Sequence, residues 1–204
     1  KRRILGVVPH LVVSGEVDPA LLDDPRIVAR APFIERHGLL LNGSLSQLVT
    51  LYGIDVLSES EMSIVPENMT QGSMEDLGDE QHGIVIGRVL AYRLGLVLGD
   101  SLTMVIPEPS AGGHRFSPRV SQVRLVGTFE LESELDYRLA LLNITELQRI
   151  VGGPAADTRV RLNNVFDAPA LNGALTSGEG SNVRDWTQQY GDFFEAVKME
   201  KIMM

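Results

Sequence analysis

Cysteine is absent from this chain of 204 residues. Its absence excludes disulfide bonds, thiolate catalysis and zinc sites that depend on cysteine. Aromatic residues are scarce, at 5%, so the predicted core consists of Leu, Val and Ile. No apolar run approaches the roughly 20 residues that a membrane-spanning helix needs. By itself, the chain is therefore predicted to fold as a globular domain in water.

Basic residues are outnumbered by acidic ones, 18 against 27, which gives a net charge of -9. Binding to nucleic acid needs clustered Lys and Arg that displace counterions from phosphates, so nucleic acid is not a predicted partner. Hydrophobic residues make up 44% and charged residues 22%, close to the average for globular domains. This composition also excludes a disordered chain.

Motifs for catalysis and cofactor binding are missing as well. The only histidines are His10, His37, His82 and His114, and none has the spacing of a metal site such as HExxH. There is no phosphate-binding loop and no GxSxG motif. We therefore predict no enzyme activity, no cofactor and no metal, with ATP hydrolysis in a separate chain. The alternative, an α+β enzyme, would require a polar pocket around His37 or His82.

Two further patterns have structural interpretations. Gly87 and Gly95 are predicted to open and close one helix, because the glycine spacing does not match the dinucleotide motif GxGxxG. The acidic residues Glu130, Glu132 and Glu134 alternate along a predicted strand, which would place them on one solvated face.

Hydrophobic periodicity predicts mixed secondary structure along the whole chain. Asn42-Gly43 is the strongest hairpin signal and predicts an antiparallel pair over residues 31–55. Residues 58–82 lack periodicity and are predicted to be a connecting stretch with one short helical turn. The remaining predicted strands are 9–15, 83–87, 101–107, 120–131, 139–144, 158–164 and 182–189. The remaining predicted helices start at Asp18, Gly87, Thr145 (as N-cap) and Phe166 (with Pro169 in the first turn), and a last helix covers 193–204. The helix capped by Thr145 is predicted to end at Gly152-Gly153-Pro154.

The segment from Pro107 to Pro118 is unusual because it contains far more proline and glycine than a tight hairpin requires. Its prolines restrict the backbone, and Gly112 and Gly113 allow a reversal at the tip. We predict a preformed, protruding loop suited to insertion into a partner.

Both ends of the sequence suggest a domain from a larger protein. The chain opens abruptly on Lys1-Arg2-Arg3, and the periodicity of residues 193–204 continues to the last residue without a capping signal. We expect this segment to be helical and to continue into a membrane span in the intact protein.

Residues 83–108, GIVIGRVLAYRLGLVLGDSLTMVIPE, resemble the LolC and LolE permease subunits of lipoprotein-releasing ABC transporters. The resemblance extends to both ends of the chain and to its interior. Matching positions are Ile4, Leu5, Gly6, Pro9 and His10, then Gly127, Thr128, Phe129, Ser133, Glu134, Asp136, Asn143 and Ile144, and finally Phe194 to Val197 through Met204.

The resemblance implies an α+β fold with two subdomains. Residues 1–57 and 138–204 would form an outer α/β sandwich built from both chain ends. Residues 58–137 would form a mostly β middle subdomain with the protruding loop 107–118.

The resemblance also implies a function on the periplasmic side of the inner membrane of Gram-negative bacteria. Such permeases pair LolC with LolE, or two hybrid subunits, and work with the separate ATPase LolD. They transfer outer-membrane lipoproteins to the carrier LolA, and the match leaves the choice among LolC, LolE and hybrid open. In LolC-like subunits a loop called the hook captures LolA, which implies partner-binding roles here for Pro107, Pro109, His114, Arg115, Phe116, Pro118 and Arg119. The alternative is the related periplasmic domain of a MacB-type efflux or export permease, which would contact a periplasmic adaptor.

Overall fold

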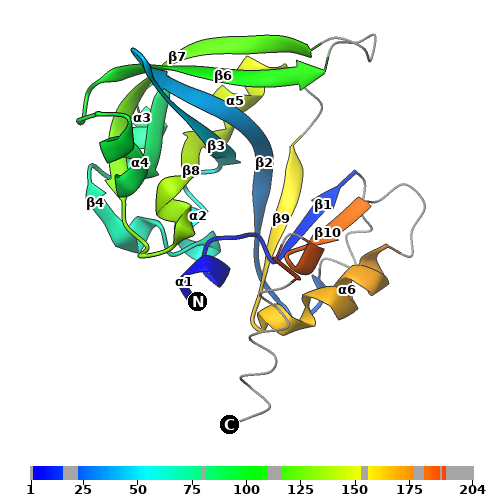
Figure 1. Cartoon of the computed structure of the whole chain (residues 1–204). Coiled ribbons are helices and arrows are strands. Elements are labelled where there is room, and N and C mark those ends of the chain that lie inside the picture. The colour runs from blue at the N-terminus through cyan, green and yellow to red at the C-terminus, as the bar shows by residue number, and fades with distance from the viewer. Residues whose placement is uncertain are drawn as a thin grey trace. The chain divides into compact units, whose positions relative to one another are not determined.

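The computed structural model describes residues 2–15, 23–79, 81–109, 116–152, 156–176, 182–188 and 190–191. It divides into two compact units (Figure 1). Unit 1 comprises Lys1–Val7 and Pro32–Ala156, and unit 2 comprises Val8–Ala31 and Asp157–Met204. These bounds differ from the predicted subdomain boundaries near residues 57 and 137. The reason is that strands from the predicted middle segment pair directly with strands on both sides of it.

Six strands of unit 1 form a closed ring of hydrogen-bonded neighbours. The order around the ring is β2-β3-β8-β5-β7-β6, and β6 pairs back with β2. The pairs β3–β8 and β5–β7 are parallel and the other pairs are antiparallel. A closed ring leaves no free sheet edge where its strands pair. The strands are β2 (Ile27–Asn42, of which residues 32–42 belong to unit 1), β3 (Leu45–Ile54), β5 (Gly83–Gly87), β6 (Ser101–Pro109), β7 (Phe116–Phe129) and β8 (Leu139–Asn143).

The hairpin predicted at Asn42-Gly43 is confirmed. Asn42 pairs with Leu45 across a two-residue connection, and Gly43 has a φ of 59°, the conformation that such tight turns demand. Alternation along the strands then separates the two faces of the ring. Residues on the inner face, among them Leu40, Leu51 and Met104, are fully buried in one core cluster.

Two helices contribute to this core. Helix α4 (Arg88–Arg93) follows β5 directly, as predicted. Helix α5 (Ile144–Val151) begins two residues earlier than predicted, because Asn143 rather than Thr145 is the N-cap: its Oδ1 accepts from Thr145 N at 3.0 Å. The predicted end of α5 is confirmed, since Gly152 adopts the left-handed conformation with a φ of 61°.

The segment between β3 and β5 contains more structure than predicted. Its elements are α2 (Glu59–Met62), the 3-10 helix η2 (Pro66–Asn68), β4 (Met69–Gln71) and α3 (Met74–Asp79). Met62, Val65, Met74 and Leu77 are buried. Each helix has one turn or little more, so no apolar periodicity could develop in the sequence.

The acidic run after β7 does not form a strand face, which corrects the prediction. Strand β7 ends at Phe129, Glu132 has a φ of 51°, and Glu134 starts the 3-10 helix η3 (Glu134–Tyr137). Asp136 is 2% exposed and accepts from Leu131 N at 2.7 Å and Ser133 N at 3.1 Å. These hydrogen bonds fold the acidic residues into a capped turn instead of an extended strand.

Unit 2 is a small α/β layer. Strand β1 (Leu11–Ser14) lies antiparallel between β9 (Asp157–Leu162) and β10 (Asn182–Asp185). The other elements are the 3-10 helix η4 (Val165–Asp167) and α6 (Ala168–Leu175), which has Pro169 in its first turn as predicted. Two polar side chains hold the layer together: His10 Nδ1 accepts from Leu162 N at 3.0 Å, and Trp186 Nε1 donates to Val165 O at 2.9 Å.

Two predicted helices, the one from Asp18 and the one over 193–204, lie outside the described residues. Within the part of the chain that is described, none of the helices is both long and apolar enough to cross a membrane.

Candidate functional site

The strands β6 and β7 form a long antiparallel ribbon that leads to the predicted loop (Figure 1). Their ladder runs from the pair Ser101–Arg124 to the pair Pro109–Phe116. The predicted loop runs from residue 107 to residue 118, but the structure places both of its ends, residues 107–109 and 116–118, in the ladder. The connection itself, residues 110–115, lies outside the described residues.

Two prolines face each other across this ribbon, Pro107 and Pro118. In an antiparallel ladder, opposite residues either exchange two N–H···O bonds or point these groups away from each other. Proline has no N–H, so this pair must be of the second kind, and the ladder continues undisturbed. The two prolines therefore restrict the backbone of the ribbon without interrupting its ladder, although the proline content of this segment predicted a loop.

An apolar row runs across four strands on the outer face of the ring. Leu48 of β3 is opposite Leu39 of β2, Leu39 is opposite Val105 of β6, and Val105 is opposite Val120 of β7. Leu48 is 78% exposed and Val120 is 63% exposed, while the two central residues are half-buried.

The exposed proline pair extends this row along the ribbon, because Pro107 and Val105 share one face of β6, as Pro118 and Val120 do on β7. We call the six residues Leu39, Leu48, Val105, Val120, Pro107 and Pro118 the ribbon face. Next to it, Gln122 Nε2 donates to Thr103 Oγ1 at 2.7 Å. The ribbon face is thus an exposed apolar surface with a polar margin, as protein-binding surfaces commonly have.

The predicted site residues fall into three groups. Pro107 and Pro118 belong to the ribbon face. Arg119 is opposite the buried Ile106, so it lies on the other face of β7, where its guanidinium approaches Gly152 at the end of α5. The other four are Pro109 and Phe116, described only as the last backbone pair of the ladder, and His114 and Arg115, which lie outside the described residues.

Sequence reasoning missed the four Leu and Val residues of the ribbon face. Leu39 and Val105 stand in runs of three apolar residues, 39–41 and 104–106, so alternation in the sequence does not show that they face outward. Their meeting in one row depends on the pairing register of four strands, which local sequence does not specify.

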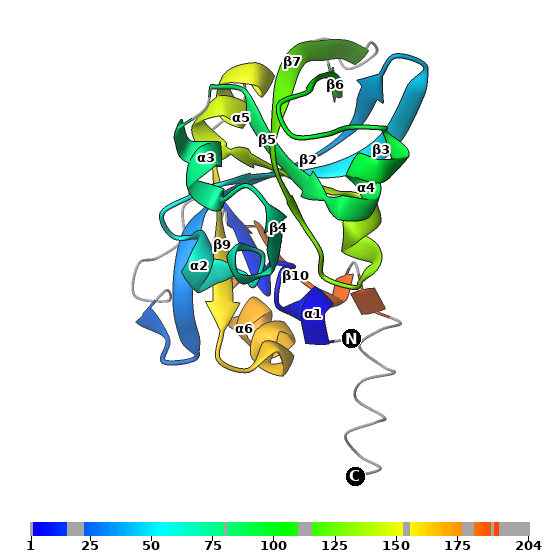
Figure 2. The same cartoon turned by 90° about the vertical axis from the view of Figure 1, so that its left-hand side faces the viewer.

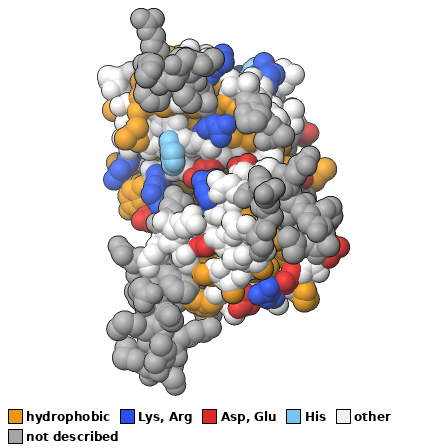
Figure 3. Space-filling view, turned by 90° about the vertical axis from the view of Figure 1, so that its right-hand side faces the viewer, with side chains coloured by type: hydrophobic (Ala, Val, Ile, Leu, Met, Phe, Trp, Pro, Cys, Tyr) orange, Lys and Arg blue, Asp and Glu red, His pale blue; other side chains and the backbone are white. Residues whose placement is uncertain are grey.

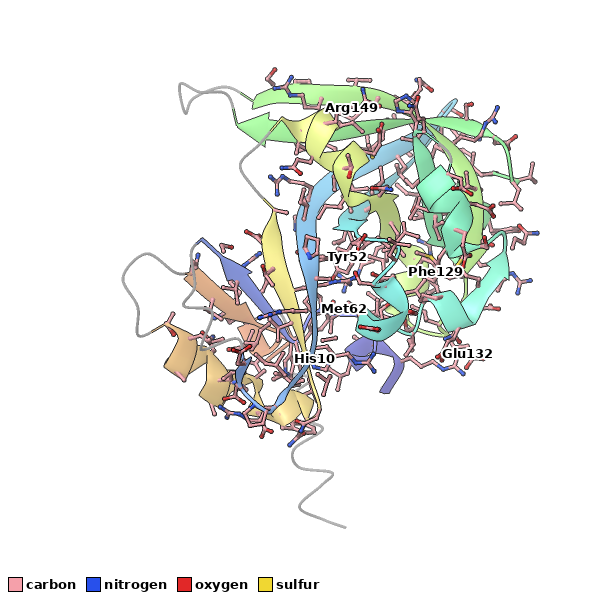
Figure 4. The ribbon with its side chains drawn as sticks, turned by 180° about the vertical axis from the view of Figure 1, so that it is seen from behind. His10, Tyr52, Met62, Phe129, Glu132 and Arg149 are labelled. Atoms are coloured by element: carbon pink, nitrogen blue, oxygen red, sulfur yellow. The ribbon has the colours of Figure 1, made fainter. Side chains whose placement is uncertain are left out.

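A cluster of three charged or titratable side chains lies apart from the ribbon face. The carboxylate of Glu146, at the start of α5, is hydrogen-bonded by Nδ1 of His82 and by Nη2 of Arg149, the latter at 2.6 Å (Arg149 is labelled in Figure 4). Partial burial tends to raise the pKa of Glu146, but the hydrogen bonds from Arg149 and His82 outweigh burial and hold the pKa below its usual value. The cluster joins α5 to the residue that precedes β5.

The remaining histidines of the described part do not gather polar groups around a pocket. His37 is 71% exposed and its nearest charged partner is Glu35 on the same strand, at 3.9 Å. His10 is occupied by its hydrogen bond within unit 2. Among the described residues, no group of three or more His, Asp and Glu side chains could hold a metal ion. On the face shown in Figure 3, basic and acidic side chains are interspersed with hydrophobic ones.

No family model matches the chain, but curated relatives match nearly all of it. The lipoprotein-releasing system transmembrane protein LolC of Neisseria meningitidis is 31% identical over 218 residues, which are 99% of the chain and 52% of the relative. LolC of Xylella fastidiosa is 27% identical over 215 residues, with the same coverages. LolE of Haemophilus influenzae is 22% identical over 221 residues, which are 100% of the chain and 53% of the relative. The chain thus spans about half the length of these relatives.

Solved structures with a similar fold include domains of two ABC transporters. The periplasmic region of MacB from Actinobacillus actinomycetemcomitans has a TM-score of 0.52 and 13% identity, and covers 94% of this chain and 95% of that one. The extracellular domain of the transporter YknZ from Gram-positive bacteria also has a TM-score of 0.52 and 13% identity, and covers 82% and 86%. The resemblance to LolC and LolE is therefore confirmed along nearly the whole chain, and the fold is the mixed, sheet-rich α and β fold of MacB-like periplasmic domains.

Proposed function

We propose that this chain is the periplasmic domain of a permease subunit in a lipoprotein-releasing ABC transporter of the Gram-negative inner membrane. The match of relatives named LolC and LolE to 99% and 100% of the chain carries this proposal. In this role the domain receives outer-membrane lipoproteins released from the inner membrane and passes them to the periplasmic carrier LolA. It works without catalysis, beside a partner permease subunit, a separate LolD-like ATPase, and membrane spans outside these 204 residues.

The ribbon supplies the surface on which such a carrier could dock. Its apolar face is exposed before any partner binds, and the opposed prolines restrict the backbone, so little conformational entropy is lost on binding. Burying exposed Leu and Val side chains against an apolar partner is favourable by roughly 25 cal/mol per Å². Docking at the ribbon face would therefore add to any contact made by residues 110–115 beyond it.

The loop residues retain their proposed roles within this scheme. Phe116 and the neighbouring prolines would enter an apolar cavity of the carrier. Arg115 and Arg119 would steer a carrier with an acidic rim by long-range attraction. Arg119 lies on the face opposite the proline pair, so its effect should be on the rate of association more than on contacts in the complex.

A binding measurement with purified LolA tests the proposal. We expect the wild-type chain to bind, and Phe116→Ala to lower the affinity by about thirtyfold, which corresponds to about 2 kcal/mol for the loss of a buried aromatic anchor. Leu48→Asp should weaken binding because it places a charge in the apolar row. Arg119→Ala should mainly slow association and reduce its dependence on salt.

Two outcomes of the binding measurement would contradict carrier docking. If wild-type chain binds LolA but Phe116→Ala and Leu48→Asp both bind as tightly, then neither the loop nor the ribbon face contacts the carrier. A wild-type chain that does not bind LolA at all would favour a role on the cargo side of the transporter.

A MacB-type permease domain is the second candidate, since the MacB periplasmic region has the same fold over 94% of the chain. Such a domain would contact a periplasmic adaptor instead of LolA. The intact gene distinguishes the two candidates, because MacB carries a fused ATPase whereas the lipoprotein-releasing type uses a separate one.

A further inference from the structure

The dipeptide Asn-Gly occurs twice in this chain, at Asn42-Gly43 and at Asn172-Gly173. Asparagine before glycine is chemically labile, because the backbone nitrogen of the glycine can attack the side-chain amide carbon and no side chain on the glycine hinders the approach. The other five asparagines precede Met, Ile, Asn or Val, whose side chains obstruct the same attack. The two Asn-Gly sites share this chemistry, so the structure around each site decides whether it reacts.

At Asn42-Gly43 the attacking nitrogen lies in the turn of the β2–β3 hairpin. Asn42 pairs with Leu45 at the end of the ladder, and the two residues between them belong to no pair. Gly43 is exposed, and a Cβ built on it would have no heavy atom within 4 Å. The N–H of Gly43 is thus outside the strand ladder, in a turn that is open to water.

At Asn172-Gly173 the same nitrogen lies inside the helix α6, which runs from Ala168 to Leu175. An N–H at this position of a helix donates to the carbonyl four residues earlier. The side-chain Nδ2 of Asn172 donates to Asp185 Oδ2 at 2.6 Å. Both reacting groups are therefore held in hydrogen bonds, and attack requires α6 to open locally.

The side chain of Asn42 is held more weakly than the helix holds Asn172-Gly173. Asn42 is half-buried, and its Nδ2 donates to Leu94 O at 2.8 Å, where the hairpin stands beside α4 (Figure 2). A neutral hydrogen bond contributes little net free energy because water replaces the lost partner. Attack at Asn42 needs only a rotation of this side chain, whereas attack at Asn172 needs local unfolding of a helix.

We propose that Asn42-Gly43 is a site of spontaneous deamidation in the folded chain and that α6 protects Asn172-Gly173. The Gly43 nitrogen loses its proton to hydroxide and bonds to Cγ of Asn42, and the side-chain nitrogen leaves as ammonia. Water then opens the resulting cyclic imide at either of its carbonyls. One opening gives aspartate, and the other gives isoaspartate, in which the main chain passes through the side-chain carbon. No electrons are transferred, and water is the co-reactant.

Either product weakens the contact between the hairpin and the end of α4. Aspartate at residue 42 places a carboxylate, which has no proton to donate, against the carbonyl of Leu94. Isoaspartate also lengthens the main chain beside Leu45, whose side chain approaches Gly95. Leu94 and Leu96 are buried in the core, so the modification loosens a segment that closes the core of unit 1. This effect does not depend on carrier docking.

Peptide mapping by mass spectrometry tests the proposal, after incubation of the folded 204-residue chain in isotopically labelled water. Residue 42 should take up the heavy oxygen and be recovered as aspartate and isoaspartate. The rate should rise with pH, because the attacking nitrogen must lose its proton. Asn172 should react more slowly by about tenfold or more, which corresponds to about 1.4 kcal/mol or more for opening the helix.

Controls separate the effect of the fold from that of the dipeptide. In guanidinium chloride, where the chain is unfolded, both sites should react at similar rates because neither nitrogen is held. Asn42→Gln keeps an amide but needs a larger ring, so it should abolish the rapid reaction at residue 42 and leave Asn172 unchanged. Asn42→Asp reproduces one product and should lower the unfolding temperature.

Two results would overturn the proposal. If Asn42 stays intact in the folded chain while it reacts in guanidinium chloride, the hydrogen bond to Leu94 protects it and the folded chain has no deamidation site there. If Asn172 reacts in the folded chain as fast as Asn42, the surrounding structure does not control the reaction. An unchanged unfolding temperature of Asn42→Asp would contradict the expected loosening at the end of α4.

Discussion

Gly87 stands where β5 passes into α4, and the backbone of η3 occupies the space that a side chain would need. A Cβ at this position would lie 2.3 Å from Asp136 O and 2.6 Å from Asp136 C. The φ of Gly87 is -58°, so the restriction is one of space and not of backbone conformation. We predict that Gly87→Ala lowers the free energy of unfolding by about 3 kcal/mol, measured by urea denaturation.

A matched substitution should have the opposite sign. Gly173 lies inside α6, and a Cβ there would have no heavy atom within 4 Å. Alanine favours a helix interior over glycine by about 0.5–1 kcal/mol, so Gly173→Ala should raise the free energy of unfolding. Equal effects of the two substitutions would show that the contact with Asp136 is not what restricts Gly87.

His10 is a hydrogen-bond acceptor in the core of unit 2. It is 9% exposed, and its Nδ1 accepts from Leu162 N at 3.0 Å. His10→Ala leaves this buried N–H without its acceptor, which should lower the free energy of unfolding by about 1–3 kcal/mol. His10→Asn offers a carbonyl oxygen at a similar position and should recover much of the loss. If asparagine is as harmful as alanine in denaturation experiments, packing of the ring matters more than the hydrogen bond.

At the scale of elements, α5 is joined to the start of β5 by the Glu146 cluster. Since hydrogen bonds from Arg149 and His82 hold the folded-state pKa of Glu146 below its usual value of 4.5, ionised Glu146 stabilises the fold. This contribution is complete above the unfolded-state pKa and is lost as the pH falls through the folded-state pKa. Glu146→Gln should therefore lower the unfolding temperature at neutral pH, and the difference from wild type should shrink below about pH 4.5.

The control for this prediction is Glu75→Gln. Glu75 is exposed on α3, so removing its charge should change the unfolding temperature little at any pH. A difference between wild type and Glu146→Gln that stays constant from neutral to acidic pH would mean that the lost charge is not the cause.

Elements with a strong local signal could be predicted from the sequence. Asn42-Gly43 requires a tight turn wherever it stands between apolar runs, and Gly152 ends α5 by a conformation that few other residues adopt. The short helices α2 and α3 could not be predicted, because each is held by burial of one or two apolar side chains such as Met62 and Leu77. Strand β4 could not be predicted either, because it is held by its pairing with β7. Their structure is a product of tertiary packing.

The candidate site, too, could be predicted from the sequence only where the signal was local. Proline content drew attention to the segment from Pro107 to Pro118, since proline restricts φ wherever it occurs. It could not reveal that Pro107 and Pro118 are opposite each other, nor that Leu48 joins Val120 in one row. Both facts depend on strand register, which is set by contacts between residues far apart in sequence.

At the scale of the whole molecule, one strand belongs to both units. Strand β2 runs from Ile27 to Asn42, and the boundary between the units falls between Ala31 and Pro32. We therefore expect the units to unfold in one cooperative transition. Trp186 is the only tryptophan and is buried in unit 2 at 3% exposure, so its fluorescence reports unit 2 alone.

This expectation can be measured with a substitution in unit 1. Gly87→Ala should shift the transition followed by Trp186 fluorescence as much as the transition followed by far-ultraviolet circular dichroism. A fluorescence transition that does not move would show that unit 2 unfolds independently.

The opposed prolines of the ribbon also affect its tendency to aggregate. The backbone groups of this pair point away from the ladder between β6 and β7, toward the two outer edges of the ribbon. Pro107 therefore presents no N–H on the edge of β6, just beyond the last residue of β6 that pairs with β2. Pro118 presents none on the outer edge of β7. An exposed two-stranded ribbon would otherwise be a template for further strands, and thus a seed for aggregation. The two missing donors therefore oppose strand-by-strand association of the ribbon with further copies of itself, while its apolar face stays exposed.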